Sequence, residues 1–167
     1  MKIGLLSDTH SHMDDQILKH FKECDEIWHA GDIGNRKIME PLQEIAPVVA
    51  VYGNIDDASL RIEFPEDQIF VRNKHKIYMT HIGGYPGRYK SRAKLIIQEE
   101  RPQIFVCGHS HILKVISDPV EGLLHMNPGA CGHHGFHKVR TLLRFDLHET
   151  GIANLEVIEL GKRGTLR

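Results

Sequence analysis

The stretch KIGLLSDTH (residues 2–10) is an apolar run that ends in an aspartate and a histidine. The run is typical of a buried strand, and residues 13–21 after it carry apolar side chains at helical spacing. The pattern repeats, with strands expected over 25–32 and 47–54 and a helix over 37–45 between them. This β-α-β-α-β order predicts a parallel sheet with right-handed crossovers.

The second half of the chain is richer in strand patterns. Residues 68–72 and 76–81 are expected to pair through the polar turn at 73–75. A helix is expected over 89–100 and another buried strand over 103–109. The remaining apolar runs are expected to form one antiparallel run joined by Gly and Pro turns: 112–118, 122–127, 141–148 and 152–160. The sequence therefore predicts an α/β layered domain with a mixed sheet or sheets.

Length and composition exclude several classes of protein. The 167 residues suit one domain, expected over 1–160 and followed by a short basic tail at 161–167. A formal net charge of −1 gives no electrostatic basis for binding a nucleic-acid duplex or an anionic membrane, and it disfavours a nuclease. No apolar segment is long enough for a signal-peptide core or a membrane span. Cys24, Cys107 and Cys131 lack CxxC spacing, so we expect reduced thiols and a cytoplasmic protein.

Polar side chains with metal-binding atoms follow five of the expected strands: Asp8 and His10, Asp32, Asn54, His81, and His109 with His111. In an open α/β sheet the carboxyl ends of the strands line one crevice. Glycines beside these residues (Gly31, Gly53, Gly108) permit tight turns and close approach. Taken singly, each motif is more often a cap or a turn. Together they form a nitrogen and oxygen ligand set that suits two metal ions sharing a bridging carboxylate.

The order of these motifs resembles a known family. The chain shows D-x-H, then GD, GN, a single histidine and GHxH, with Asn127-Pro128-Gly129 after them. This pattern resembles the calcineurin-like metallophosphoesterases, and the short uncapped chain is most similar to the small YfcE-type phosphodiesterases and the related retromer subunit Vps29. The resemblance implies a four-layer α-β-β-α sandwich, with two mixed sheets flanked by helices.

The resemblance also implies a site and a reaction. One metal ion would be held by Asp8, His10, Asp32 and His111, and the other by Asp32, Asn54, His81 and His109. Asp32 would bridge both ions, and Asp32, Asn54 and His81 would act in catalysis together with a metal-bound hydroxide. Mn²⁺ is the ion this branch implies, although the ligand types also fit Fe, Ni, Zn or Co. The implied activity is hydrolysis of a small phosphodiester.

The sequence departs from the family pattern next to the GN dipeptide. Related sequences often carry a histidine there that protonates the leaving group, whereas this chain has Ile55. A positioned general acid contributes typically about 10²–10⁴-fold, so we expect modest turnover that favours good leaving groups. Asp56 is a candidate for a supporting role or for a helix cap.

A second departure follows His81, where Ile82-Gly83 replaces the frequent H-G-H. The histidine-rich segment 129–137 follows the N-P-G turn. Its His133, His134 and His137 either form a solvated loop, contact substrate or act as a proton donor. His134 is the candidate proton donor.

The sequence is compatible with two functions. The first is a metal-dependent phosphodiesterase acting on a small diester, and the alternative is a non-catalytic, Vps29-like interaction scaffold. The presence of every expected metal ligand favours the enzyme. Exposed late strands would permit a homodimer or a higher oligomer.

Overall fold

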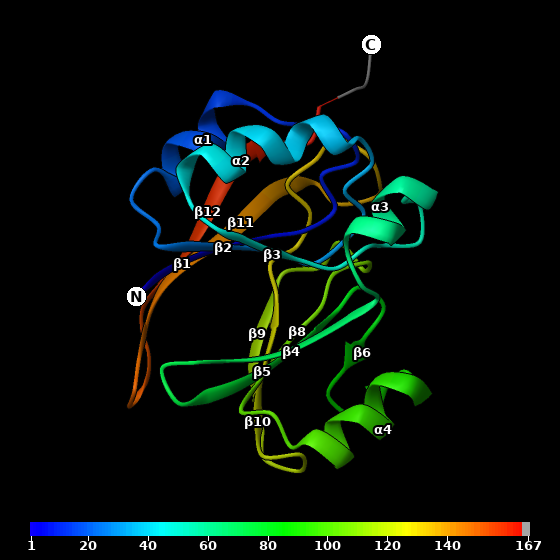
Figure 1. Cartoon of the computed structure of the whole chain (residues 1–167), viewed down its shortest axis with the longest axis vertical. Coiled ribbons are helices and arrows are strands. Elements are labelled where there is room, and N and C mark those ends of the chain that lie inside the picture. The colour runs from blue at the N-terminus through cyan, green and yellow to red at the C-terminus, as the bar shows by residue number, and fades with distance from the viewer. Residues whose placement is uncertain (165–167) are drawn as a thin grey trace.

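Two five-stranded mixed sheets form the centre of the computed structural model, which describes residues 1–164 (Figure 1). The first has the order β12-β11-β1-β2-β3. Its strands are β1 (Lys2–Leu6), β2 (Glu26–His29), β3 (Val48–Ala50), β11 (Val139–His148) and β12 (Gly151–Lys162). The first three run parallel, as the β-α-β-α-β order predicts, and β11 joins β1 antiparallel.

The second sheet has the order β4-β5-β8-β10-β9. Its strands are β4 (Asp67–Arg72), β5 (His75–Thr80), β8 (Ile104–Val106), β9 (Lys114–Asp118) and β10 (Leu123–Asn127). The strands β4 and β5 form the expected hairpin, although His75 already belongs to β5 and pairs with Arg72. A separate two-stranded sheet consists of β6 (Gly84–Tyr85) and β7 (Arg88–Tyr89).

Helices cover the outer face of each sheet, which gives four layers (Figure 1). They are α1 (Asp15–Phe21), a 3-10 helix (Arg36–Ile38), α2 (Met39–Ile45), α3 (Ala58–Glu63) and α4 (Ser91–Glu100). One apolar cluster joins α1 and α2 to the first sheet, and another joins α4 to the second. A third cluster lies between the sheets, where Leu5 and Trp28 meet Met79 and Val106. This arrangement confirms the expected α-β-β-α sandwich.

Two expectations about the carboxyl-terminal half are wrong in detail. The late strands do not form one antiparallel run, because β9 and β10 belong to the second sheet whereas β11 and β12 belong to the first. Because β10 pairs in parallel with β8, the β9–β10 pair lies in the second sheet, apart from the β11–β12 pair in the first. Gly161 and Lys162, assigned above to the tail, are the last residues of β12. Residues 165–167 of the predicted tail lie outside the described residues.

No helix among residues 1–164 is long and apolar enough to cross a membrane.

Candidate metal centre

Five loops at the carboxyl ends of strands meet where the two sheets adjoin. The loops after β1, β2 and β3 come from the first sheet, and those after β5 and β8 come from the second. Hydrogen bonds join loops within the first sheet and between the two sheets: the Asp8 amide donates to the Gly31 carbonyl at 3.0 Å, and the His109 amide donates to Asp8 Oδ2 at 3.1 Å. The predicted crevice therefore exists, but both sheets contribute to it.

The ligand atoms of five predicted residues cluster there. Asp8, His10 and His111 form one group, and Asp8, Asp32 and His81 form another, with the ligand atoms of each group within 4.8 Å of one another. Asp8 Oδ1 lies 3.0 Å from His111 Nε2. The structure thus brings these five residues into two adjacent half-sites, which overlap at Asp8.

Asp32 lies between the two half-sites. Its Oδ2 is 3.6 Å from Nε2 of His10, and its Oδ1 is 3.2 Å from Nε2 of His81. Gly53 is required here because a Cβ at that position would lie 2.0 Å from Asp32 Oδ1. One carboxylate with an oxygen facing each half-site has the placement that a bridging ligand needs.

Asn54 and His109 lie at the open side of the centre. Both are exposed, whereas Asp8, Asp32 and His81 are buried. The His109 ring centroid is 5.3 Å from that of His81, and its backbone amide donates to Asp8 Oδ2 at 3.1 Å. His109 does not belong to the two compact groups of ligand atoms. The assignment of Asn54 and His109 as ligands remains a prediction.

The side chains of the two groups fit a metal ion, as shown by unpaired polar atoms. Within residues 1–164, Asp8 Oδ1, His10 Nε2 and His81 Nε2 are buried without a hydrogen-bond partner. Leaving buried polar atoms without a partner costs free energy. A buried cluster of such atoms therefore indicates a functional site, here one that fits a bound metal ion. The Nδ1 of His81 lies 2.8 Å from the Ala30 carbonyl. Donation there places the proton on Nδ1 and leaves Nε2 free to bind a metal ion.

His111 is oriented by a second histidine, His137, for which the sequence predicted no such role. Nδ1 of His111 is 3.2 Å from Nδ1 of His137, and Nε2 of His137 is 3.0 Å from the Gly132 carbonyl. The carbonyl can only accept, so Nε2 of His137 donates and its Nδ1 accepts from His111. Nε2 of His111, which faces Asp8, is then unprotonated, as a metal ligand must be.

Backbone strain is concentrated in the loops that carry the ligands. Positive φ angles occur at five of the predicted ligands: Asp8 (55°), His10 (47°), Asp32 (54°), His109 (66°) and His111 (57°). Each such non-glycine residue costs roughly 1–2 kcal/mol, and such residues are typical of functional sites. If each motif were only a cap or a turn, positive φ angles would not be expected at so many of the predicted ligands.

Asp56 is the support of this centre and not a helix cap. Its buried carboxylate accepts from the amides of Ile33 (3.1 Å), Gly34 (2.7 Å) and Gly53 (2.7 Å). Asp56 therefore fastens the loop that carries Asp32 to the loop that carries Asn54. The neighbouring Asp57 is the cap of α3, because its side chain accepts from the amides at the start of that helix.

The histidine-rich segment packs over the centre and is not simply a solvated loop. The His134 ring centroid is 4.7 Å from that of His10. A cavity of about 240 Å³ is lined by His10, Asp32, Asn54, Ile55 and His134, among others. Ile55 therefore faces the centre, as expected of the position where relatives carry a histidine, and His134 faces the same cavity.

The pKa values of the clustered groups are coupled to one another. Burial raises the pKa of Asp32, but the nearby His81 and the charge of His10 prevail and lower it. Burial opposes protonation of His81, yet Asp32 and Asp8 prevail and raise its pKa. For His10, burial outweighs both carboxylates and lowers the pKa. The cluster thus combines an ionised carboxylate with histidine nitrogens.

Comparison with known proteins agrees with this geometry. The profile of the calcineurin-like phosphoesterase superfamily domain matches residues 1–150. A Methanocaldococcus jannaschii protein named "Probable metallophosphoesterase" is 31% identical over 136 residues, which cover 78% of this chain and 68% of that protein. The chain belongs to the calcineurin-like phosphoesterase superfamily. Family membership and the two ligand groups together indicate a site for divalent metal ions.

Solved structures share the fold at low sequence identity. A structure of a novel archaeal phosphodiesterase has a TM-score of 0.76 and 22% identity, covering 96% of this chain and 100% of that one. Wild-type Vps29 of Entamoeba histolytica in complex with Zn²⁺ has a TM-score of 0.73 and 16% identity, covering 98% of this chain and 100% of that one. The chain therefore has the fold of these proteins.

Proposed function

We propose that this protein is a phosphodiesterase that hydrolyses a small phosphodiester at a centre of two divalent metal ions. The observation that carries the proposal is the position of Asp32, whose two carboxylate oxygens face His10 and His81 in adjacent half-sites. Asp8, His10, Asp32 and His111 would hold one ion, and Asp32, Asn54, His81 and His109 the other. When bound, the ions supply Lewis acidity toward phosphoryl oxygen and lower the pKa of water.

The protein's own groups would position the substrate and handle its protons. With two divalent ions bound, the carboxylates of Asp8 and Asp32 would offset only part of the metal charge. The neutral histidines and Asn54 would add no negative charge, so the ions would stay electrophilic. His134 would donate the proton to the leaving group, because it lines the cavity that Ile55 and Asn54 also line. Ile55 has no transferable proton, so this role falls to the histidine-rich segment.

The choice of Mn²⁺ as the working ion is part of the proposal. Nitrogen and oxygen ligands without sulfur suit Mn²⁺ as well as Zn²⁺, Fe, Ni and Co. The Vps29 structure that shares this fold was determined with Zn²⁺, so Zn²⁺ is the comparison ion for any assay.

The test uses metal-stripped protein with Mn²⁺ added back and assays an aryl phosphodiester beside the matching monoester. Wild type is compared with Asp32→Ala and with the control Asp146→Ala, whose carboxylate is exposed and bonds to Asn154 at 2.7 Å. The proposal predicts Mn²⁺-dependent diester cleavage that disappears in Asp32→Ala only. Tight metal uptake without turnover on either ester would instead support the interaction scaffold.

A further inference from the structure

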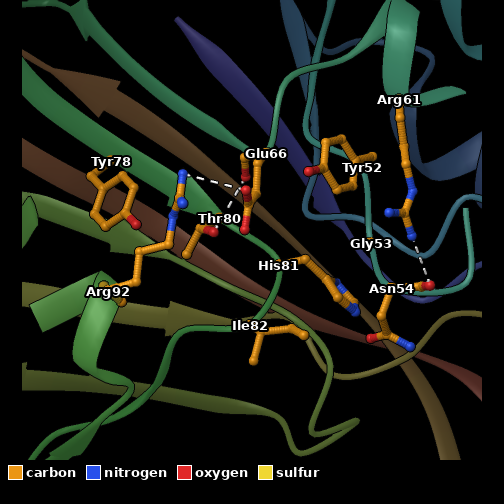
Figure 2. A pocket seen from close by; sticks show the side chains of 11 residues that line it. Tyr52, Gly53, Asn54, Arg61, Glu66, Tyr78, Thr80, His81, Ile82 and Arg92 are labelled. Carbon is orange, nitrogen blue, oxygen red and sulfur yellow. Dashed lines mark hydrogen bonds and ion pairs between the residues drawn. The ribbon is translucent and has the colours of Figure 1, made fainter. Parts of the chain in front are cut away.

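A second cavity, of about 210 Å³, adjoins the metal centre on the side of Asn54 and His81 (Figure 2). Tyr52, Tyr78 and Ile82 contribute ring and aliphatic surface to its lining. In Figure 2, Tyr52 and Tyr78 lie to either side of Glu66 and Thr80. Because Asn54 and His81 belong to both the centre and this cavity, one organic group of a phosphoester bound at the centre can extend into it.

One of the two arginines at the rim of the cavity is committed to the protein. Arg61 donates from Nε to the Asp56 carbonyl at 2.7 Å and from Nη2 to the Asn54 carbonyl at 3.1 Å. Its guanidinium also lies over the Tyr52 ring, 5.0 Å from the centroid. Arg61 thus fixes Tyr52 and the Asn54 loop, and its main donors are not directed at a ligand.

The second arginine is paired with two carboxylates. Arg92 donates from Nε to Asp67 Oδ2 at 3.0 Å, and its Nη2 lies 3.3 Å from Glu66 Oε2. The other oxygen of Asp67 accepts from Tyr78 Oη at 2.8 Å. The formal charges of Arg61, Arg92, Glu66 and Asp67 therefore cancel. Glu66, half exposed at the rim, retains acceptor capacity beside Tyr52.

We infer that this cavity is a subsite for a neutral, ring-bearing ester group that donates a hydrogen bond to Glu66, and not for a second phosphate. The rings and Ile82 offer stacking and apolar contact to such a group. A second phosphate would meet the Glu66 carboxylate, whereas the two arginines beside it already direct donors at the protein: Arg61 at two carbonyls and Arg92 at two carboxylates. Placing a phosphate beside Glu66 in a partly dehydrated cavity is therefore unfavourable. The inference rests on the proposed function and adds the class of substrate.

The test measures binding of non-hydrolysable phosphonates to the Mn²⁺-loaded full-length protein by calorimetry. Phenylphosphonate, methylphosphonate and 4-carboxyphenylphosphonate are compared, so that the ring and its charge vary separately. Variants are Tyr52→Leu, Glu66→Gln and, as a control, Tyr85→Leu, which removes a ring on β6 that does not line this cavity. Methylphosphonate reports whether the metal centre itself remains intact in each variant.

The subsite predicts that phenylphosphonate binds roughly tenfold more tightly than methylphosphonate. It also predicts that Tyr52→Leu removes most of this preference, that Tyr85→Leu retains it, and that the carboxylated ring binds more weakly unless Glu66 is changed to Gln. An equal affinity for phenyl and methyl compounds, or tighter binding of the carboxylated ring to wild type, would overturn the subsite. Diester turnover is measured in parallel. A preference for the phenyl compound without turnover would support the subsite and contradict the proposed function. Turnover without that preference would support the proposed function and contradict the subsite.

Discussion

Nδ1 of His111 lies 3.2 Å from Nδ1 of His137, and this contact fixes which nitrogen of His111 faces the metal centre. His137 is in turn fixed by the Gly132 carbonyl. The close approach requires Gly135, since a Cβ there would lie 2.1 Å from Nδ1 of His111. The histidine-rich segment is therefore part of the structure that orients a metal ligand.

Replacing His137 by Phe should weaken Mn²⁺ binding by roughly 10- to 100-fold, because a supporting hydrogen bond to a ligating imidazole is lost. Competition with a chelator measures the affinity. His137→Gln can both accept from His111 and donate to Gly132, so it should recover part of the loss. The exposed His148→Phe is the control. Equal affinity of wild type and His137→Phe would show that the contact has no role in metal binding.

Asp56→Asn should destabilise the protein by roughly 3 kcal/mol, because one amide oxygen cannot replace a carboxylate that accepts from three backbone amides. Metal binding should weaken as well, since the Asp32 and Asn54 loops lose their connection. Urea unfolding and chelator competition measure the two effects. Asp57→Ala removes only the cap of α3, so it should cost about 0.5–2 kcal/mol and leave metal binding unchanged. If Asp56→Asn and Asp57→Ala changed stability and metal affinity equally, Asp56 would not be the residue that supports the metal centre.

His134→Phe should reduce turnover according to the leaving group. An alkyl leaving group needs a proton, so its release should slow by about 100-fold or more. A nitrophenolate departs without protonation, so its release should change little. His133→Phe, whose ring packs 4.3 Å from that of His12, is the control. A uniform loss over all leaving groups would argue against proton donation by His134.

The stability of the protein should fall in mild acid because of His125, a buried residue on β10 of the second sheet. Burial, with Lys114 adding to it, lowers the pKa of His125 from 6.5 to about 4. The unfolded state then binds a proton that the folded state does not, so stability is lost as the pH falls from about 6.5 toward about 4.

The expected loss from this group is on the order of 2 kcal/mol between about pH 7 and about pH 5. His125→Phe keeps a ring beside Phe105 and Tyr89 and should remove that part of the pH dependence. Urea unfolding of both proteins at the two pH values gives the difference. Parallel pH profiles would show that His125 is not buried in its neutral form.

Local patterns predicted the strands and the polar residues at their ends, because side-chain period and strand termination are visible in neighbouring residues. The role of Asp56 was not visible in this way, since its partners Ile33 and Gly34 lie 23 and 22 positions away. The contact of His137 with His111 likewise spans 26 positions. The division of the late strands between two sheets depended on long-range pairing of β10 with β8 and of β11 with β1. The segment 129–137 was noticeable only for its many histidines, and its sequence did not show which of them contacts His111.

Whether two ions act together at Asp32 can be measured in a single titration. Mn²⁺ is added stepwise to the stripped protein while bound ions and the rate of aryl diester cleavage are measured on the same samples. Two ions are expected to bind per chain, and the rate is expected to rise mainly with the second. Full activity with one bound ion, or saturation of metal binding at a single ion, would contradict the proposed centre of two ions.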